Sequence, residues 1–113
     1  TLPQNSFSLG REWTITNDNA VTGKDSILLY NFSANKVFLV LRPPKSGAGI
    51  VRVFLDGKLA ENLNAGLDVN NGVITIDQDR LYNLIDLKGN SGNHLLKLEF
   101  LSPGVEVFAF TFG

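Results

Sequence analysis

The stretch PGVEVFAFTFG, residues 103–113, decides the fold class of this sequence. Side chains of a strand alternate between its two faces, so one face here carries three phenylalanines and the other carries small, mostly apolar residues. This pattern predicts a central strand that is covered on both sides. The preceding Pro103-Gly104 suits a type II turn, because Pro fixes φ at the second position and Gly accepts a positive φ at the third. We expect this turn to fold the last strand back on the one before it.

Seven further apolar runs precede this strand, and clusters of Asn, Asp and Gly separate them. Runs of this length, rich in β-branched and aromatic residues, are typical of strands and too short for most helices. They cover residues 7–15, 26–32, 36–42, 50–56, 73–76, 80–87 and 94–101. About eight strands predict an all-β, jelly-roll-like sandwich of two antiparallel sheets, whose amphipathic faces bury each other. An immunoglobulin-like order is the alternative, because periodicity does not reveal the connectivity.

Two connections carry more specific expectations. Asp56-Gly57 suits a type I′ hairpin, since both residues tolerate positive φ. Residues 58–64 could form a short helical turn, but the asparagines there favour irregular structure. We expect the strands over residues 37–41 and 108–112 to be the best buried.

Length and composition indicate a single domain. Ten Lys and Arg against 11 Asp and Glu leave no basic field for nucleic acid. No apolar run approaches the roughly 20 residues needed to cross a bilayer. The chain has no Cys, which predicts that it has no thiol-disulfide activity of its own.

Motifs for catalysis, metals or cofactors do not emerge from the sequence, and we expect no catalytic residue, no metal and no cofactor. No G-x-S-x-G or phosphate-binding loop occurs. The one histidine, His94, is best explained as a strand-edge residue. Asp77 and Asp79, with Asp68 nearby, could offer oxygen ligands to calcium, but a polar turn between two strands explains them more simply.

The aromatic residues offer the remaining candidate site. Sugar-binding sandwiches present Trp or Tyr rings to pyranose rings, with polar side chains at the rim. The candidate residues are the aromatic Trp13, Tyr30 and Tyr82 and the basic Arg42, Arg52 and Arg80. The competing interpretation is that Trp13, in register with Ile15, fills the core and that both tyrosines bury their rings. We favour this packing interpretation; gathering of the three rings on one exposed face would favour the sugar site.

Five segments in order carry a resemblance to a known family. They are residues 32–41 (FSANKVFLVL), 51–57 (VRVFLDG), 66–69 (GLDV), 79–85 (DRLYNLI) and 103–113, in which the terminal AFTFG is the most specific piece. The chain from Ser6 onward resembles the C-terminal, carbohydrate-binding-module-like β-sandwich domain of DipZ-type thioredoxin-like proteins, which are thiol-disulfide interchange proteins.

The resemblance implies an N-terminal thioredoxin-like domain with a Cys-x-x-Cys motif in a bacterial parent protein. By the same resemblance, residues 1–5 are the end of an interdomain linker and residues 6–113 are the single β-sandwich domain. It further implies a location outside the cytoplasm, periplasmic or on the cell-envelope side, and work in thiol-disulfide exchange or cytochrome c maturation. No active-site residue carries over to this chain. We expect a non-catalytic accessory module that packs against the thioredoxin-like domain or another partner, without nucleic-acid binding or membrane insertion. The alternative is a carbohydrate-binding module that localises the redox domain to cell-envelope or other glycans.

Overall fold

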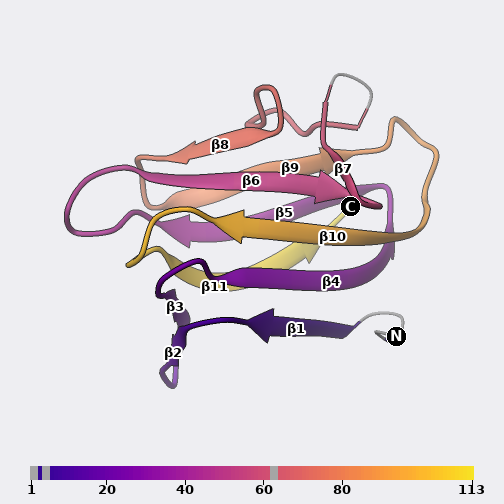
Figure 1. Ribbon diagram of the computed structural model, residues 1–113. Coiled ribbons are helices and arrows are strands. Elements are labelled where there is room, and N and C mark those ends of the chain that lie inside the picture. The colour runs from indigo at the N-terminus through magenta and orange to yellow at the C-terminus, as the bar shows by residue number, and fades with distance from the viewer. Residues whose placement is uncertain (1–2, 4–5, 62–63) are drawn as a thin grey trace.

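Eleven strands build the computed structural model, which describes residues 3, 6–61 and 64–113 (Figure 1). In chain order they are β1 (Ser6–Gly10), β2 (Trp13–Ile15), β3 (Ala20–Thr22), β4 (Ile27–Ala34), β5 (Lys36–Arg42), β6 (Gly49–Leu55), β7 (Lys58–Leu59), β8 (Val73–Ile76), β9 (Arg80–Asp86), β10 (Gly92–Phe100) and β11 (Glu106–Phe112). The described part of the chain contains no helix long and apolar enough to cross a membrane.

The strands form two antiparallel sheets that lie face to face. The first sheet has the order β1-β4-β10-β6-β7, with β8 also paired to β6, and the second has the order β2-β3-β11-β5-β9. Figure 1 shows β4, β10 and β6 in front of β11, β5 and β9. The predicted all-β, jelly-roll-like two-sheet sandwich is confirmed.

The core lies between the sheets and is made by alternate positions of the central strands. In β5, Val37, Leu39 and Leu41 are fully buried, as the alternation of this strand predicts. The largest buried side chains on the other strands are Tyr82, Phe32, Phe100, Ile74, Ile76, Leu84, Ile85, Leu96 and Leu98. Both sheets therefore contribute to one continuous apolar core.

The expectation of one strand over residues 7–15 is wrong, because the chain changes sheets inside it. β1 belongs to the first sheet and β2 to the second. Arg11, between them, has φ of 70°, a left-handed conformation that a regular strand cannot contain. The two short strands β3 and β7 are additional to the eight that the sequence suggests.

The Asp56-Gly57 turn confirms the predicted type I′ hairpin, with φ of 51° and 86° at its two residues. The hairpin continues into β7, which pairs with β6 where irregular structure was expected. Of the irregular stretch predicted over residues 58–64, residues 62–63 lie outside the described residues, and so do residues 1–2 and 4–5 of the predicted linker.

The turn at Pro103-Gly104 has the positive φ expected at Gly104, 90°, but it does not return the chain to β10. The next strand, β11, pairs with β3 and β5 in the opposite sheet, so this part of the prediction is wrong. Hydrogen bonds to Thr22 direct the chain there: the amide of Gly104 donates to its carbonyl (2.9 Å) and the amide of Val105 to its hydroxyl (2.9 Å).

β11 is a central strand, but it is not covered on both faces as its sequence suggests. The pairing with β5 shifts register between Val107 and Phe110, which marks a β-bulge. Beyond the bulge Phe110 is only half-buried, whereas Ala109 and Thr111 are exposed. The expectation that residues 108–112 are among the best buried is therefore wrong, because the bulge breaks the simple alternation.

Candidate functional site

An apolar cleft opens between β1 and β4 of the first sheet and β11 of the second. Its volume is about 560 Å³, within the range of ligand sites. Its walls consist of apolar and aromatic side chains, and residues 16–19 lie at one end. The cleft exists because β3 pairs with β11 only at Glu106 and Val107, so that the rest of β11 has no strand beside it on this side among the described residues.

Tyr30 and the three phenylalanine rings that contact it form an aromatic wall of the cleft. The Tyr30 ring stacks on Phe7 at 5.9 Å between centroids and meets Phe110 and Phe112 edge-on at 4.8 and 5.3 Å. Phe7 is 57% exposed and Phe112 is 39% exposed. Aromatic surface left open in a concave site favours apolar or ring-shaped ligand groups.

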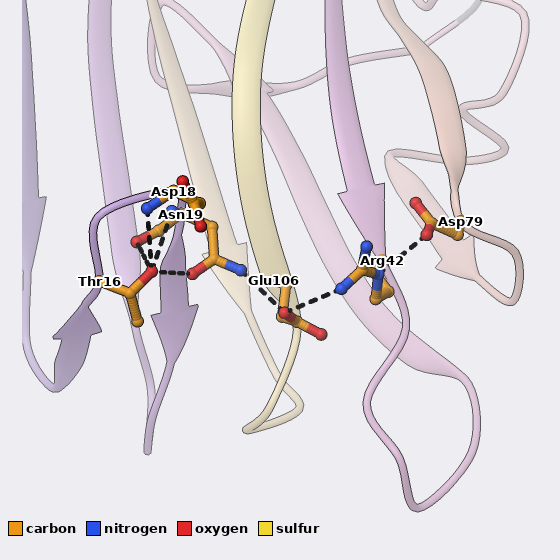
Figure 2. A network of polar contacts seen from close by, with 6 residues as sticks. All are labelled: Thr16, Asp18, Asn19, Arg42, Asp79 and Glu106. Carbon is orange, nitrogen blue, oxygen red and sulfur yellow. Dashed lines mark hydrogen bonds and ion pairs between the residues drawn. The ribbon is translucent and has the colours of Figure 1, made fainter.

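The connection between β2 and β3 forms the polar end of the cleft. The Thr16 hydroxyl accepts hydrogen bonds from the amides of Asp18 (3.3 Å) and Asn19 (3.1 Å), and it donates to the Asn19 side-chain oxygen at 2.6 Å (Figure 2). A hydroxyl that binds amides two and three residues on fixes a tight turn. This turn places Asp18 among the residues that line the cleft.

A chain of polar contacts anchors this turn to the second sheet. The side-chain amide nitrogen of Asn19 donates to Glu106 Oε1 (2.8 Å). The same oxygen accepts a hydrogen bond from Arg42 Nη1 (3.3 Å), and Arg42 Nε donates to Asp79 (2.8 Å) (Figure 2). The hydrogen bond to Asp79 is the main cause that raises the pKa of Arg42 above its ordinary value. The contacts connect the turn to β11, β5 and the residue just before β9. Their exposed ion pairs contribute little stability individually, so positioning is their main consequence.

Trp13 is half-buried, and its indole nitrogen bonds within the protein. It donates to the carbonyls of Gly10 (2.8 Å) and Ile27 (3.2 Å), and its ring meets buried Phe100 edge-on at 5.4 Å. Ile15, which was expected to accompany it into the core, is 64% exposed at the rim of the cleft. That expectation is wrong because β2 is a short strand at the edge of the second sheet as described, and its last residue lies at the rim of the cleft and not over the core.

Tyr82 is fully buried, so it offers no ring to a ligand. Its hydroxyl donates to the Gln78 carbonyl (2.7 Å) and accepts from the Gln78 amide (3.1 Å). The Arg80 guanidinium lies 4.0 Å from the Tyr82 ring centroid and binds Asp68. Its burial agrees with the packing interpretation favoured for it, because alternation in β9 directs Tyr82 inward opposite Leu39.

Arg52 pairs with Glu99 at 3.6 Å on neighbouring strands of the first sheet. The structure therefore does not bring the six candidate residues together: Tyr30 alone lines the cleft, and Arg42 is linked to the cleft end through Glu106 and Asn19. Sequence reasoning missed Phe7, Phe110, Phe112 and Asp18. The alternating phenylalanines of the last strand are the signal that the sequence offers, but alternation alone indicates a packed face and not an open one.

The remaining polar candidates form local contacts. His94 Nδ1 lies 2.5 Å from Asp56, which connects the hairpin turn to β10. Asp68 and Asp79 each bind an arginine, Arg80 and Arg42 respectively. Among the described residues there is no group of three or more His, Cys, Asp or Glu side chains that could hold a metal ion.

Asp68 joins the loop before β8 to β9, and its contacts predict a pH effect on stability. Burial raises the pKa of Asp68, but hydrogen bonds from Arg80 and Asn83 outweigh it and hold the pKa below the ordinary 3.8. The stabilisation of the folded state by these hydrogen bonds to the Asp68 carboxylate is therefore complete above the pKa of Asp68 in the unfolded chain. It is lost as the pH falls through the lower pKa in the folded chain. We expect Asp68→Asn to lower the free energy of unfolding at pH 7 by about 1.5 kcal/mol, with the difference from wild type vanishing in acid. Urea unfolding from pH 7 to pH 2.5 measures this; a difference that persists at pH 2.5 contradicts it.

Comparison with known proteins gives one family match. The model of a family described as thioredoxin-like C-terminal domain matches residues 1–113. No curated protein matches the chain.

Solved structures show the same fold at low sequence identity. A family two carbohydrate esterase from Clostridium thermocellum, in complex with cellohexaose, superposes with a TM-score of 0.75 at 13% identity over 96% of this chain. The chain spans 31% of that esterase. CsCBM6-3 from Clostridium stercorarium, in complex with cellobiose, superposes with a TM-score of 0.60 at 16% identity, over 100% of this chain and 97% of that one. These likenesses establish a carbohydrate-binding-module-like sandwich as the fold.

Proposed function

We propose, from the premise that this chain belongs to the family of thioredoxin-like C-terminal domains, that it is a non-catalytic accessory module. In this role it contacts the thioredoxin-like domain of its parent protein through the cleft. The parent carries out thiol-disulfide exchange outside the cytoplasm. The absence of Cys from residues 1–113 supports the division of labour, because a thiolate nucleophile must come from another part of the parent.

The observation that carries the proposal is the apolar character of the cleft. Its aromatic wall leaves Phe7 and Phe112 substantially exposed, and apolar surface of this kind on a rigid scaffold marks an interaction site. Trp13 and Tyr82, the other two candidate stacking rings, form contacts inside the protein. The indole nitrogen of half-buried Trp13 is hydrogen-bonded to a backbone carbonyl, and Tyr82 is fully buried. Contact with protein therefore fits the side chains better than contact with a purely polar ligand.

The position of the cleft supports the thioredoxin-like domain as its partner. The chain enters the sandwich through β1 (Ser6–Gly10), its first strand, so a domain that precedes this module in the parent would be connected to it on the side of β1. Phe7 of β1 forms one wall of the cleft. The cleft is thus adjacent to the point where a preceding domain would be attached.

Saccharide binding is the second candidate function, and one observation favours it. The cleft combines the Tyr30 ring with Asn17 and Asp18 at its polar end, and rings with nearby amide and carboxylate groups are the usual elements of a sugar site. The superposed esterase and CsCBM6-3 were solved with cellohexaose and cellobiose. A cell-envelope glycan would then localise the parent.

The proposal can be tested by nuclear magnetic resonance on ¹⁵N-labelled residues 1–113. Addition of the thioredoxin-like domain of the same parent is expected to shift the amide signals of Phe7, Tyr30 and Phe112. Phe112→Ser should remove these shifts, because it replaces an exposed cleft ring with a small polar group. Leu101→Ser is the matched control, since Leu101 is 46% exposed and lies outside the cleft lining.

The outcomes separate the two functions. Shifts confined to other surfaces, or none at all, contradict docking through the cleft. A parallel titration with cellohexaose that shifts the same three signals, with loss in Phe112→Ser, supports the saccharide function instead.

A further inference from the structure

We infer that the cleft binds an extended peptide segment of its protein partner as an added strand beside β11. The segment has apolar side chains at alternate positions and a basic residue at its C-terminal end. The inference rests on the proposed function, in which the cleft contacts a protein, and it specifies the form of the contact.

The open edge of β11 is the first reason. β11 pairs with β5 at Glu106 and Val107 and, past the bulge, from Phe110 to Phe112, but β3 accompanies it on the other side only at Glu106 and Val107. Within the described residues, positions 110–112 thus have a strand on one side only, and positions 108–109 form the bulge that leads to them. A strand edge with exposed backbone groups is a template for a further strand.

The side chains beside this edge supply the second reason. A peptide in the place that β3 leaves vacant would lie opposite Phe7 and Leu9 of β1, and every second side chain would point toward the cleft. Apolar side chains at those positions would cover the partly exposed rings of Phe7 and Phe112. Backbone hydrogen bonds would then provide affinity and the cleft would select the side chains.

Charge supplies the third reason and fixes the basic residue. Asp18 is the one charged residue among the described residues that line the cleft. Nearby, Arg42 already pairs with both Glu106 and Asp79, so the surroundings of the turn are net acidic. A cation on the occupant complements this charge.

The direction of the added strand follows from β3. β3 is antiparallel to β11 and starts at Ala20, opposite Val107. A peptide that continues the line of β3 runs in the same direction and therefore ends next to the turn at residues 16–19. Its C-terminal residue consequently meets Asp18, whereas its N-terminal residue lies near Phe112.

The test uses residues 1–113 and an acetylated heptapeptide amide with valine at positions 2, 4 and 6, threonine at positions 1, 3 and 5, and lysine at position 7. We expect saturable binding by nuclear magnetic resonance, with the largest shifts at the amides of residues 108–112. N-methylation of a peptide amide that faces β11 should weaken binding by about fivefold. N-methylation of the neighbouring amides, which face away, should leave binding unchanged. No shift at residues 108–112, or equal effects of the two methylation patterns, overturns the inference.

Asp18→Lys tests the charge with little risk to folding, because Asp18 is exposed. It should weaken the lysine peptide about threefold and strengthen a variant peptide with a C-terminal glutamate. Asp77→Lys makes the same charge change beside β9 at the opposite edge of the sheet and should alter neither affinity.

If the thioredoxin-like domain shifts the cleft signals but no peptide binds, strand addition is wrong and the proposed function stands. If a peptide binds as expected but that domain does not, the proposed partner is wrong; if cellohexaose alone binds, both are wrong.

Discussion

Phe100→Ala is expected to lower the free energy of unfolding by about 3–5 kcal/mol. The Phe100 side chain is fully buried at the end of β10, opposite Val51 of β6. Removal of the ring leaves a cavity that a core between two hydrogen-bonded sheets cannot close without distortion. It also removes the edge-on partner of Trp13, whose indole nitrogen is fixed by two carbonyl groups.

Urea denaturation monitored by circular dichroism and by Trp13 fluorescence measures this effect. Phe54→Ala is the matched control, because Phe54 lies on the neighbouring strand but is only half-buried, beside Lys97. Its cost should be clearly smaller, about 1 kcal/mol. Similar losses in both variants would mean that burial between the sheets is not the cause.

Gly66→Ala is expected to lower the free energy of unfolding by about 3 kcal/mol. A Cβ atom at Gly66 would lie 2.4 Å from the Asn83 carbonyl oxygen and 2.7 Å from the Leu84 carbonyl carbon. Both are backbone atoms of β9, so the loop must move away from the strand. That movement disrupts the hydrogen bond from the Gly66 amide to the Leu84 carbonyl, which is 2.9 Å long.

Gly10→Ala is the control for this experiment. The nearest atom to a Cβ at Gly10 is Ile27 Cβ at 3.8 Å, an ordinary contact, and its backbone does not require glycine. We expect a change within about 0.5 kcal/mol. The same comparison by thermal unfolding would contradict the close-approach explanation if the two alanine variants had equal stability.

The fold class could be predicted from the sequence because strand alternation is a local property. The buried series Val37, Leu39 and Leu41 follows directly from it, and so does the Asp56-Gly57 hairpin from the φ preferences of its two residues. The assignment of strands to sheets could not be predicted, because it depends on distant partners. Arg11, which separates β1 from β2, has no sequence preference for the left-handed φ that it adopts.

Most residues of the candidate site could not be predicted from the sequence, because the cleft also depends on distant partners. Phe7 and Phe112 come from opposite ends of the chain and belong to opposite sheets, and only the pairing of β1 with β4 brings Phe7 to Tyr30. From the sequence alone, Tyr30 and Tyr82 are equally plausible ligand residues. Only the register of Tyr82 opposite Leu39 shows that Tyr82 is buried.

The pairing of β4 with β10 has a consequence for the speed of folding. This pairing joins Phe32 to His94 across more than half of the sequence, and β11 reaches back to β3 in a similar way. Closing such large loops costs entropy before any of the contacts form, so chains dominated by distant pairings reach the native state in milliseconds to seconds and not in microseconds. The hairpin at Asp56-Gly57 can form early, but it cannot organise the sandwich by itself. We therefore expect the folding rate to be limited by formation of the two distant strand pairs, β4 with β10 and β3 with β11.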